Sequence, residues 1–500
     1  MSGAGERDEP ARGGGLALVT ALVLAAVVAA AYHPVLRLPL LGQDTYSAIQ
    51  ASRVASPADL AGTFTERYMD GDLWDGDVAV GLWRPGMNLF LAADHALWGL
   101  APAGWQLSNL LALLACALAV AALARRLLGP AALVGPLVAG LVLVLFPLHV
   151  EDLPVVVRRH GALSCLFVAL AVRAHLAPRR LAALGPCWTG GLLTLLAMAT
   201  KETGAIALPL AFVALWLEGT NRGWNERTER ALRAVSPSIA AVALLLAGRW
   251  AVLGGLGGLP GASMDNLTLD KGRELLERLV LPRAEAEPTG LLVWLPLAAL
   301  AVPLLAWVTS LFHPGAPGAG ERERRALAIV LAWLLGAGAL AAWAGPVYSW
   351  STFTVLVGFA LTLGVSAEIA LGALARGPAA ARLVGAAAAA PLFLIVGVDL
   401  SQSAFTTGPE RWDAAGAAFT GWQDDVRARI EGAGPGAVVL VPPPPGEWLA
   451  PHSIRAWLEL ERPGREVRVV RARRQADVPE TPLANAEGGS ADLTLVLRSW

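Results

Sequence analysis

Two ionisable side chains stand next to each other in an otherwise apolar stretch. The segment LLAMATKETGAIALPL, residues 195–210, holds Lys201 and Glu202, and lysine occurs at only one other position, Lys271. Ionisable groups at membrane depth are costly, so they usually face a cavity and a partner. An ion pair would let both residues lie near the membrane interface at low cost, and an acid at a helix start is stabilised by the helix dipole.

A second group of opposed charges lies in FPLHVEDLPVVVRRHG, residues 146–161. Its ionisable members are His149, Glu151, Asp152, Arg158, Arg159 and His160. Arginine offers a fork of donors to a phosphate, while the acids could hold a proton or a metal ion. The alternative is an interfacial salt bridge between two helices. Arg249 adds another basic position in AGRWAVLGGLGGLPG, where glycines let backbone amides approach an anion. Otherwise Arg249 would snorkel to the membrane surface.

An isolated carboxylate follows the first apolar run, in LGQDTYSAIQ. Asp44 could act there as a general base towards a hydroxyl or amine, because it can ionise while facing a half-dry cleft. The alternative is an N-cap for a helix beginning at TYSAIQASRVA, and the two roles do not exclude each other. Further along, YMDGDLWDGDV brings together four acids that a divalent ion could use, although solvated Asp-Gly turns explain them too. These acids are Asp70, Asp72, Asp75 and Asp77.

The composition predicts the kind of protein that positions these residues. The chain has 500 residues, 55% hydrophobic and 16% charged, with a mean hydropathy of +0.54. Soluble domains carry roughly a quarter of charged residues, so this composition indicates a polytopic membrane protein. A formal net charge of -1 gives no reason to expect a nucleic-acid partner. The three cysteines are isolated in apolar runs, which argues against a zinc motif or a disulfide framework.

Apolar runs predict an all-α membrane domain of about eleven transmembrane helices. A bilayer core of roughly 30 Å requires about 20 apolar residues per helix. The runs are centred near residues 15–31, 105–124, 131–147, 160–176, 181–199, 203–217, 234–252, 289–311, 326–345, 352–372 and 383–400. We expect the membrane domain to occupy residues 1–400.

Arginines in alternate short connections predict the orientation of the chain. They are Arg125, Arg126, Arg173, Arg179, Arg180, Arg222, Arg227, Arg230, Arg233, Arg322, Arg324, Arg325, Arg376 and Arg382. The positive-inside rule assigns these connections and the N-terminus to the cytoplasm. The first run could instead be a cleaved secretory signal, because AAVVAAAY offers small residues, but a retained helix fits the arginine pattern better.

Three long segments then face outward: residues 32–84, 253–288 and the tail from about 401. The tail reads as strand, helix, strand and strand, in GAVVLVPPPP, SIRAWLELERPG, REVRVVRAR and ADLTLVLRSW. We expect residues 401–500 to form a small extracytoplasmic α/β module or a partly ordered lid.

Four motifs in this order resemble the GT-C membrane glycosyltransferases, nearest to bacterial and TMTC-like protein O-mannosyltransferase relatives. They are RPGMNLFLAADHALWGLAPAGWQLSNLL, FPLHVEDLPVVVRRHGAL, ATKETGAIALPL and GRWAVLGGLGG, and the similarity covers about residues 15–260. It implies a sugar donor carried on polyprenyl phosphate and an inverting transfer on the outer face of a bacterial inner membrane. Asp44 would be the base, and Arg159, Lys201 and Arg249 would bind the donor phosphate. His149, Glu151, Asp152 and Glu202 would support them, and Arg84, Arg158 and His160 are further candidates.

The chain also departs from that family. Thr45 follows Asp44 and Gly161 follows His160, where relatives often carry acids, and PVYSWSTFTVLVGFA lacks an arginine before its tyrosine. These departures leave open a divalent metal, the sugar, and whether the acceptor is protein, lipid or glycan. Two other classes stay possible: a transporter or flippase of lipid-linked sugars, and a non-catalytic membrane assembly protein. A flippase would need the basic residues but no base, and no internal repeat typical of such transporters is visible.

Overall fold

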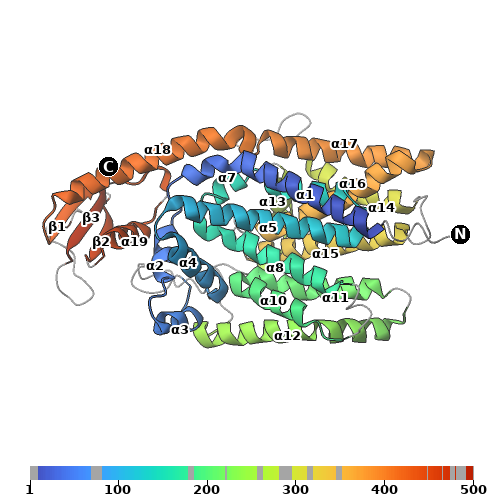
Figure 1. Cartoon of the computed structure of the whole chain (residues 1–500), viewed down its shortest axis with the longest axis horizontal. Coiled ribbons are helices and arrows are strands. Elements are labelled where there is room, and N and C mark those ends of the chain that lie inside the picture. The colour runs from blue at the N-terminus through green and yellow to red at the C-terminus, as the bar shows by residue number, and fades with distance from the viewer. Residues whose placement is uncertain are drawn as a thin grey trace. The chain divides into compact units, whose positions relative to one another are not determined.

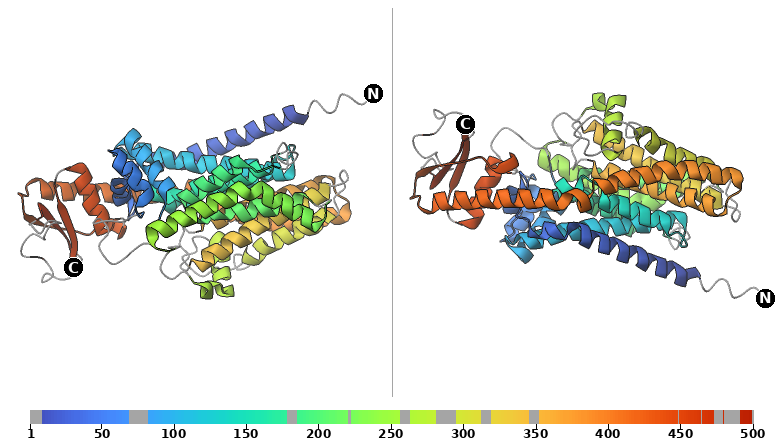
Figure 2. Two further views of the ribbon diagram at one scale, coloured as in Figure 1. Left: turned by 90° about the horizontal axis from the view of Figure 1, so that it is seen from below. Right: turned by 90° about the horizontal axis from the view of Figure 1, so that it is seen from above.

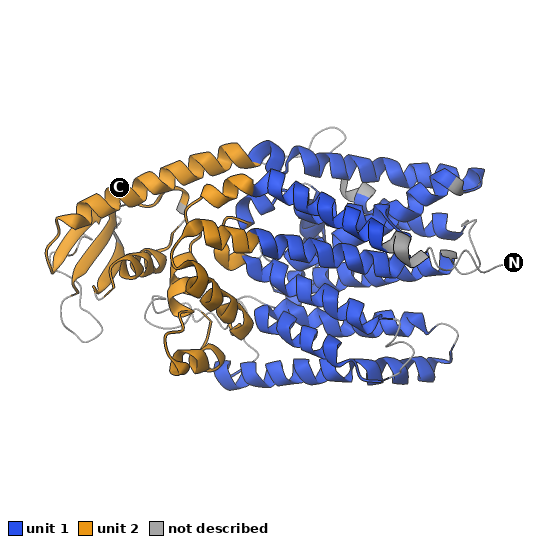
Figure 3. Cartoon of the chain, viewed as in Figure 1, with its two compact units in different colours: residues 1–32, 110–152, 159–407 blue, residues 33–109, 153–158, 408–500 orange. Residues whose placement is uncertain are grey.

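The computed structural model describes residues 9–68, 82–177, 185–219, 222–255, 263–280, 295–311, 319–344, 352–447, 449–463, 465–472, 479 and 491–498. The chain divides into two compact units, which Figure 3 distinguishes by colour. The first comprises residues 1–32, 110–152 and 159–407. The second comprises residues 33–109, 153–158 and 408–500, so it combines the long first loop with most of the tail.

The first unit is a bundle of helices that lie side by side (Figures 1 and 2). Its long helices are α1 (Glu9–Tyr32), α5 (Pro102–Leu128, from residue 110 on), α6 (Val134–Leu145), α8 (His160–His175), α10 (Trp188–Thr200), α11 (Ala207–Glu218), α12 (Trp224–Leu253), α14 (Leu295–Leu311), α15 (Ala319–Trp343), α16 (Phe353–Arg376) and α17 (Ala379–Ser401). Shorter elements are α7 (His149–Asp152), η3 (Glu202–Ile206), η4 (Met264–Asn266) and α13 (Leu269–Val280).

A helix is present at each of the eleven predicted apolar runs. Within the described residues, six helices are long and apolar enough to cross a membrane: α1, α5, α12, α15, α16 and α17. The chain is therefore an integral membrane protein, because such helices satisfy every backbone polar group internally and expose apolar side chains to lipid. Helices α6, α10 and α14 are apolar but contain shorter candidate segments. The predicted count of about eleven crossings stays a prediction.

Small residues allow close helix packing in the core of this unit. A Cβ atom on Gly364 of α16 would lie 2.4 Å from the carbonyl oxygen of Gly135 and 2.7 Å from the Ala139 side chain, both on α6. Glycine therefore permits the two backbones to approach, which is a common way to pack helices that have no hydrophobic driving force between them. Helix α16 is the most deeply buried of the six long apolar helices.

The second unit combines short helices with a small sheet. Its elements are η1 (His33–Arg37), η2 (Val156–Arg159, to residue 158), α2 (Thr45–Ala51), α3 (Pro57–Thr65), α4 (Pro85–Trp98), α18 (Ala404–Glu431, from residue 408), β1 (Ala437–Val441), η7 (Pro445–Glu447), α19 (Pro451–Glu461), β2 (Val467–Ala472) and β3 (Leu493–Arg498). The predicted order of strand, helix, strand and strand is confirmed. All three strands are parallel in the order β1-β3-β2, with Val439 opposite Leu495 and Leu495 opposite Val469.

Candidate functional site

A glycine turn positions Asp44 in the second unit. Gly42 has a φ of +116°, and a Cβ there would lie 2.5 Å from Val155 Cγ1, so both conformation and space favour glycine. Leu41 forms a bridge with Val155, and its carbonyl accepts a 2.6 Å hydrogen bond from the Thr45 hydroxyl. Asp44 stands at the N-cap of α2, because its carbonyl accepts from the N–H of Ala48 at 3.0 Å.

The predicted N-cap role of Asp44 is correct for its backbone but not for its side chain. Its carboxylate makes no capping hydrogen bond to α2. The N–H of Tyr46, one of the free donors of the first helical turn, instead donates to Ser453 Oγ of α19 at 3.1 Å. Asp44 Oδ1 lies 3.2 Å from His452 Nε2, and the exposed fractions of these side chains are 39% and 18%. The carboxylate is therefore aligned by another side chain while remaining open to solvent.

Further contacts hold α2 against α19 and α18. Gln50 Nε2 donates to Glu459 at 2.9 Å, and Gln423 Nε2 donates to the Tyr46 hydroxyl at 3.2 Å. The rings of Tyr46 and Trp457 lie 6.3 Å apart. Burial raises the pKa of Tyr46, so its phenol stays protonated. Polar and aromatic contacts together fix the start of α2.

In the first unit, Lys201 and Glu202 mark the break between α10 and α11. Lys201 has extended dihedral angles (φ −155°, ψ 140°) and ends α10, and η3 follows it. A Cβ on Gly204 would lie 2.3 Å from the Ala197 carbonyl carbon, so glycine allows η3 to fold back onto α10. Thr203 and Thr354 hydroxyls lie 3.1 Å apart and join η3 to α16. The charged pair therefore sits in a packed junction of helix ends.

Glu202 forms an ion pair with Arg249 of α12. Arg249 Nη1 lies 3.1 Å from Glu202 Oε1. The Glu202 carboxylate thus contacts a guanidinium 47 residues further along the chain, and the predicted contact of Glu202 with Lys201 stays a prediction. Arg249 is only 4% exposed, which argues against snorkelling to the surface. It lies five residues before Gly254, whose φ of +72° ends α12.

Three predicted phosphate-binding cations of this unit are buried. Lys201, Arg249 and Arg159 are 5%, 4% and 7% exposed, and each stands at or near the end of a helix. Arg159 immediately precedes α8, and Ser164 of α8 donates to the Ala197 carbonyl of α10 at 3.0 Å. Buried cations require compensating anions, because desolvation disfavours the charged form. The carboxylate of Glu202 supplies such an anion to Arg249.

His149 is buried and contacts two phenylalanine rings. Its Nε2 lies 2.7 Å from the Leu143 carbonyl oxygen, and since a carbonyl only accepts, Nε2 carries the hydrogen. Its ring contacts Phe146 and Phe353, with centroid distances of 6.0 and 5.5 Å. Nε2 is therefore not available to a metal ion in this arrangement.

The remaining predicted residues lie in different places. Asp152 and His160 are buried in the first unit, and Glu151 is partly exposed there. Arg158 and Arg84 belong to the second unit, and the Arg84 guanidinium lies 5.6 Å from the Tyr68 ring centre. Asp70, Asp72, Asp75 and Asp77 lie outside the described residues. Within the part that the structure describes, no three His, Cys, Asp or Glu residues are grouped to hold a metal ion.

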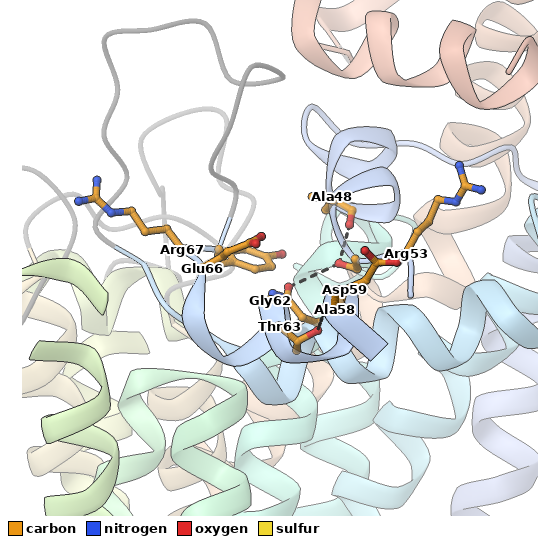
Figure 4. Close-up of a pocket in the computed structure, with 12 residues that line it drawn as sticks. Ala48, Arg53, Ala58, Asp59, Gly62, Thr63, Glu66 and Arg67 are labelled. Carbon is orange, nitrogen blue, oxygen red and sulfur yellow. Dashed lines mark hydrogen bonds between the residues drawn. The ribbon is translucent and has the colours of Figure 1, made fainter. Parts of the chain in front are cut away.

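A polar cavity of about 240 Å³ lies beside α2, α3 and α4 in the second unit (Figure 4). Arg53 and Arg67 lie on opposite sides of it, and Thr63 and Glu66 add polar groups. Asp59 also lines it but serves α3, because Oδ2 accepts from the N–H groups of Ala55 and Ser56 at 2.8 Å. These bonds, led by that of Ala55, lower the pKa of Asp59. The walls are suited to a polar molecule.

No protein-family model and no curated protein matches the chain. Among solved structures, it is similar to ArnT from Cupriavidus metallidurans bound to undecaprenyl phosphate, with 15% identity and a TM-score of 0.49 over 89% of this chain and 85% of that chain. It is also similar to the apo oligosaccharyltransferase of Archaeoglobus fulgidus, with 12% identity and a TM-score of 0.45 over 83% and 58%. A third similar structure is AglB from Archaeoglobus fulgidus with an inhibitory peptide and a dolichol-phosphate, with 12% identity and a TM-score of 0.42 over 77% and 56%. This chain spans less than two thirds of the length of the archaeal structures.

Local sequence did not predict the contacts between α2 and α19. His452, the partner of Asp44, and Ser453, the partner of Tyr46, lie about four hundred residues further along the chain, in a segment that reads only as a helix after a proline. A sequence signal for such a contact would have to be a correlated change between positions 44 and 452. A local pattern cannot contain it.

Proposed function

We propose that this chain is an integral membrane glycosyltransferase that moves a sugar from a polyprenyl-phosphate donor to an acceptor on the extracytoplasmic face. The observation that carries the proposal is the carboxylate of Asp44. It stands at a helix start without capping it, it is partly exposed, and a neighbouring side chain aligns it. These are the properties of a general base, which must be ionised and accessible to the proton it removes.

The proposed reaction is a single inverting displacement. An acceptor hydroxyl or amine gives its proton to the Asp44 carboxylate as its oxygen or nitrogen forms a bond to the anomeric carbon of the sugar. The bond from that carbon to the phosphate oxygen breaks, and its electron pair stays on the leaving lipid phosphate. Arg159, Lys201 and Arg249 would stabilise the charge that develops there. Such electrostatic stabilisation is usually the largest contribution to rate.

The donor class follows from the buried cations and from the motif resemblance. A phosphate bound near Lys201 and Arg249 would lie beside two cations that are 5% and 4% exposed, where low exposure to water strengthens the attraction between opposite charges. A divalent metal could assist, and the four acids at residues 70–77 stay candidates for it. The acceptor can be protein, lipid or glycan.

The test is transfer of radiolabelled sugar from polyprenyl-phosphate hexoses by purified protein in detergent, with solubilised membranes as the acceptor source. We expect Asp44→Asn to fold and to bind donor but to lose transfer by roughly a hundredfold or more, because the amide keeps the shape of the acid and cannot accept the proton. Asp59→Asn is the matched control. That acid lies in the same loop but serves the capping box of α3, so its amide should transfer at a near-normal rate.

Two results would reject the proposal. One is an Asp44→Asn protein that transfers sugar normally. The other is a wild-type protein that moves lipid-linked sugar across proteoliposome membranes without transferring it, and does so equally well with the amide at position 44, as expected of a flippase.

A further inference from the structure

The carboxylate of Asp44, the base proposed for the reaction, forms a hydrogen bond with a residue near the C-terminus, His452. Asp44 Oδ1 and His452 Nε2 are 3.2 Å apart. A carboxylate at neutral pH only accepts, so His452 Nε2 carries the hydrogen and donates it. Within the described residues, the Asp44 carboxylate accepts this one hydrogen bond, through Oδ1. Its second oxygen, Oδ2, therefore remains for another partner.

Two adjacent residues of α19, His452 and Ser453, make separate contacts with the start of α2. At a helix start, an aspartate side chain usually turns back to accept from the first free N–H groups. Ser453 Oγ accepts a 3.1 Å hydrogen bond from the N–H of Tyr46. That N–H is therefore already bonded and does not draw the carboxylate of Asp44 back towards the start of α2. His452, the preceding residue, bonds to that carboxylate, which makes no capping hydrogen bond to α2. One turn of α19 thus performs the capping and the alignment.

Helix α19 is itself anchored on both sides of His452. Before it, the N–H of Ala450 donates to the carbonyl of Gln43 at 3.3 Å, so the segment that precedes α19 is joined to the residue that precedes Asp44. After it, Glu459 accepts from Gln50 at 2.9 Å and from Arg455 Nε at 2.8 Å. His452 consequently lies in a helix whose position relative to α2 is fixed by hydrogen bonds on both sides of it.

We propose that His452 is a positioning residue for the transfer reaction, and that α19 is part of the catalytic centre. His452 holds Asp44 Oδ1 so that Oδ2 faces the acceptor proton. This rests on the proposed function of Asp44. His452 does not touch the reacting atoms, and its effect is on the fraction of time that the carboxylate is correctly oriented. A misplaced catalytic group can lose large factors in rate without any change in substrate binding.

Substitutions at His452 test this with kinetic constants of the full-length protein. We expect His452→Leu to lower kcat by about tenfold or more, with the KM for the polyprenyl-phosphate hexose within about twofold of wild type. His452→Gln should recover most of kcat, because its amide nitrogen reaches the position of Nε2. His452→Asn should not, because its amide is one bond shorter. His95→Leu, at a partly exposed histidine of α4 in the same unit, is the control and should leave both constants unchanged.

Each outcome separates this inference from the proposed function. If Asp44→Asn is inactive and His452→Leu has normal kcat, the inference is wrong and the base assignment stands. If wild-type protein transfers nothing or Asp44→Asn transfers normally, the proposed function fails first. In the double variant with Asp44→Asn, His452→Leu should cause no further loss, and an additive loss would contradict positioning through Asp44. If His452→Leu does not fold, equal kcat values for the glutamine and asparagine variants overturn the inference.

Discussion

Charge is concentrated at the turn that follows α10. Lys201 precedes this turn, and Glu202, its first residue, pairs with Arg249. Because Glu202 balances the guanidinium of Arg249, the three side chains together carry a net charge of +1, and an anion near Lys201 would be attracted by that charge. Lysine behaves there as a compact point charge, whereas arginine provides a planar fork.

Replacing Lys201 should affect binding more than folding. We expect Lys201→Met to weaken binding of polyprenyl phosphate by about tenfold to a hundredfold, the value of one charge-assisted hydrogen bond. Lys201→Arg should keep part of the affinity because the charge remains. Binding can be followed by tryptophan fluorescence of the purified protein.

The other lysine of the chain is the control for that experiment. Lys271 lies on α13, is partly exposed and pairs with Glu274 at 2.7 Å. Lys271→Met should bind polyprenyl phosphate like wild type. Unchanged affinity in Lys201→Met would show that Lys201 is structural and has no contact with the phosphate.

At the scale of elements, short segments determine where the residues proposed for the reaction lie. The turn at Gly42 sets the start of α2, and η3 sets the relation between α10 and α11. Both depend on a glycine that faces another backbone or a branched side chain at close range. A methyl group at such a place costs free energy, because a packed interior can only relax in part.

Gly204→Ala tests the packing of η3. We expect it to lower the free energy of unfolding by about 1 to 3 kcal/mol, because the added Cβ would lie 2.3 Å from the Ala197 backbone. Thermal unfolding in detergent measures the change. Gly338→Ala on α15 is the matched control, since nothing lies within 4 Å of its Cβ position. Alanine at position 338 should be neutral or stabilising, because alanine has a higher helix propensity than glycine. A normal melting temperature for Gly204→Ala would mean that η3 is free to shift.

At the scale of the whole molecule, the distribution of arginine predicts which ends of the helices face the cytoplasm. The positive-inside rule assigns the end of α17 to the outer side, together with the loop that holds Asp44. Transfer from a lipid-linked donor on that side requires this orientation. The orientation can be tested without reference to activity.

A cysteine at Ser401 should react with a membrane-impermeant thiol reagent added outside intact cells. Ser401 is exposed, and the native cysteines Cys116, Cys165 and Cys187 are buried, so the background should be low. Asn225→Cys, at an exposed position of the first turn of α12, should react only after the membrane is opened. Labelling of these two positions in the opposite sense would reverse the predicted topology.

The positions of the helices and of the charged breaks between them could be predicted from the sequence. A helix closes its hydrogen bonds between residues four apart, so an apolar run long enough to cross a membrane contains nearly all the information required. The same holds for the strand, helix, strand and strand of the tail, because alternation and turn residues are local. Asp44, Lys201 and Arg249 stand out for a related reason, since charge is conspicuous in an apolar context.

Which of these groups come into contact depends on the packing of distant segments. Glu202 pairs with Arg249 and not simply with the lysine beside it in the chain, because the fold of η3 turns its carboxylate towards α12. Asp44 reaches His452, and Ser453 caps the helix that Asp44 begins, across 408 and 407 residues. Side-chain hydrogen bonds depend on positions within a few tenths of an ångström, and packing of distant segments sets those positions. Local sequence therefore specifies the helices, the strands and the chemical groups on them, whereas the partners of those groups depend on how distant segments pack together.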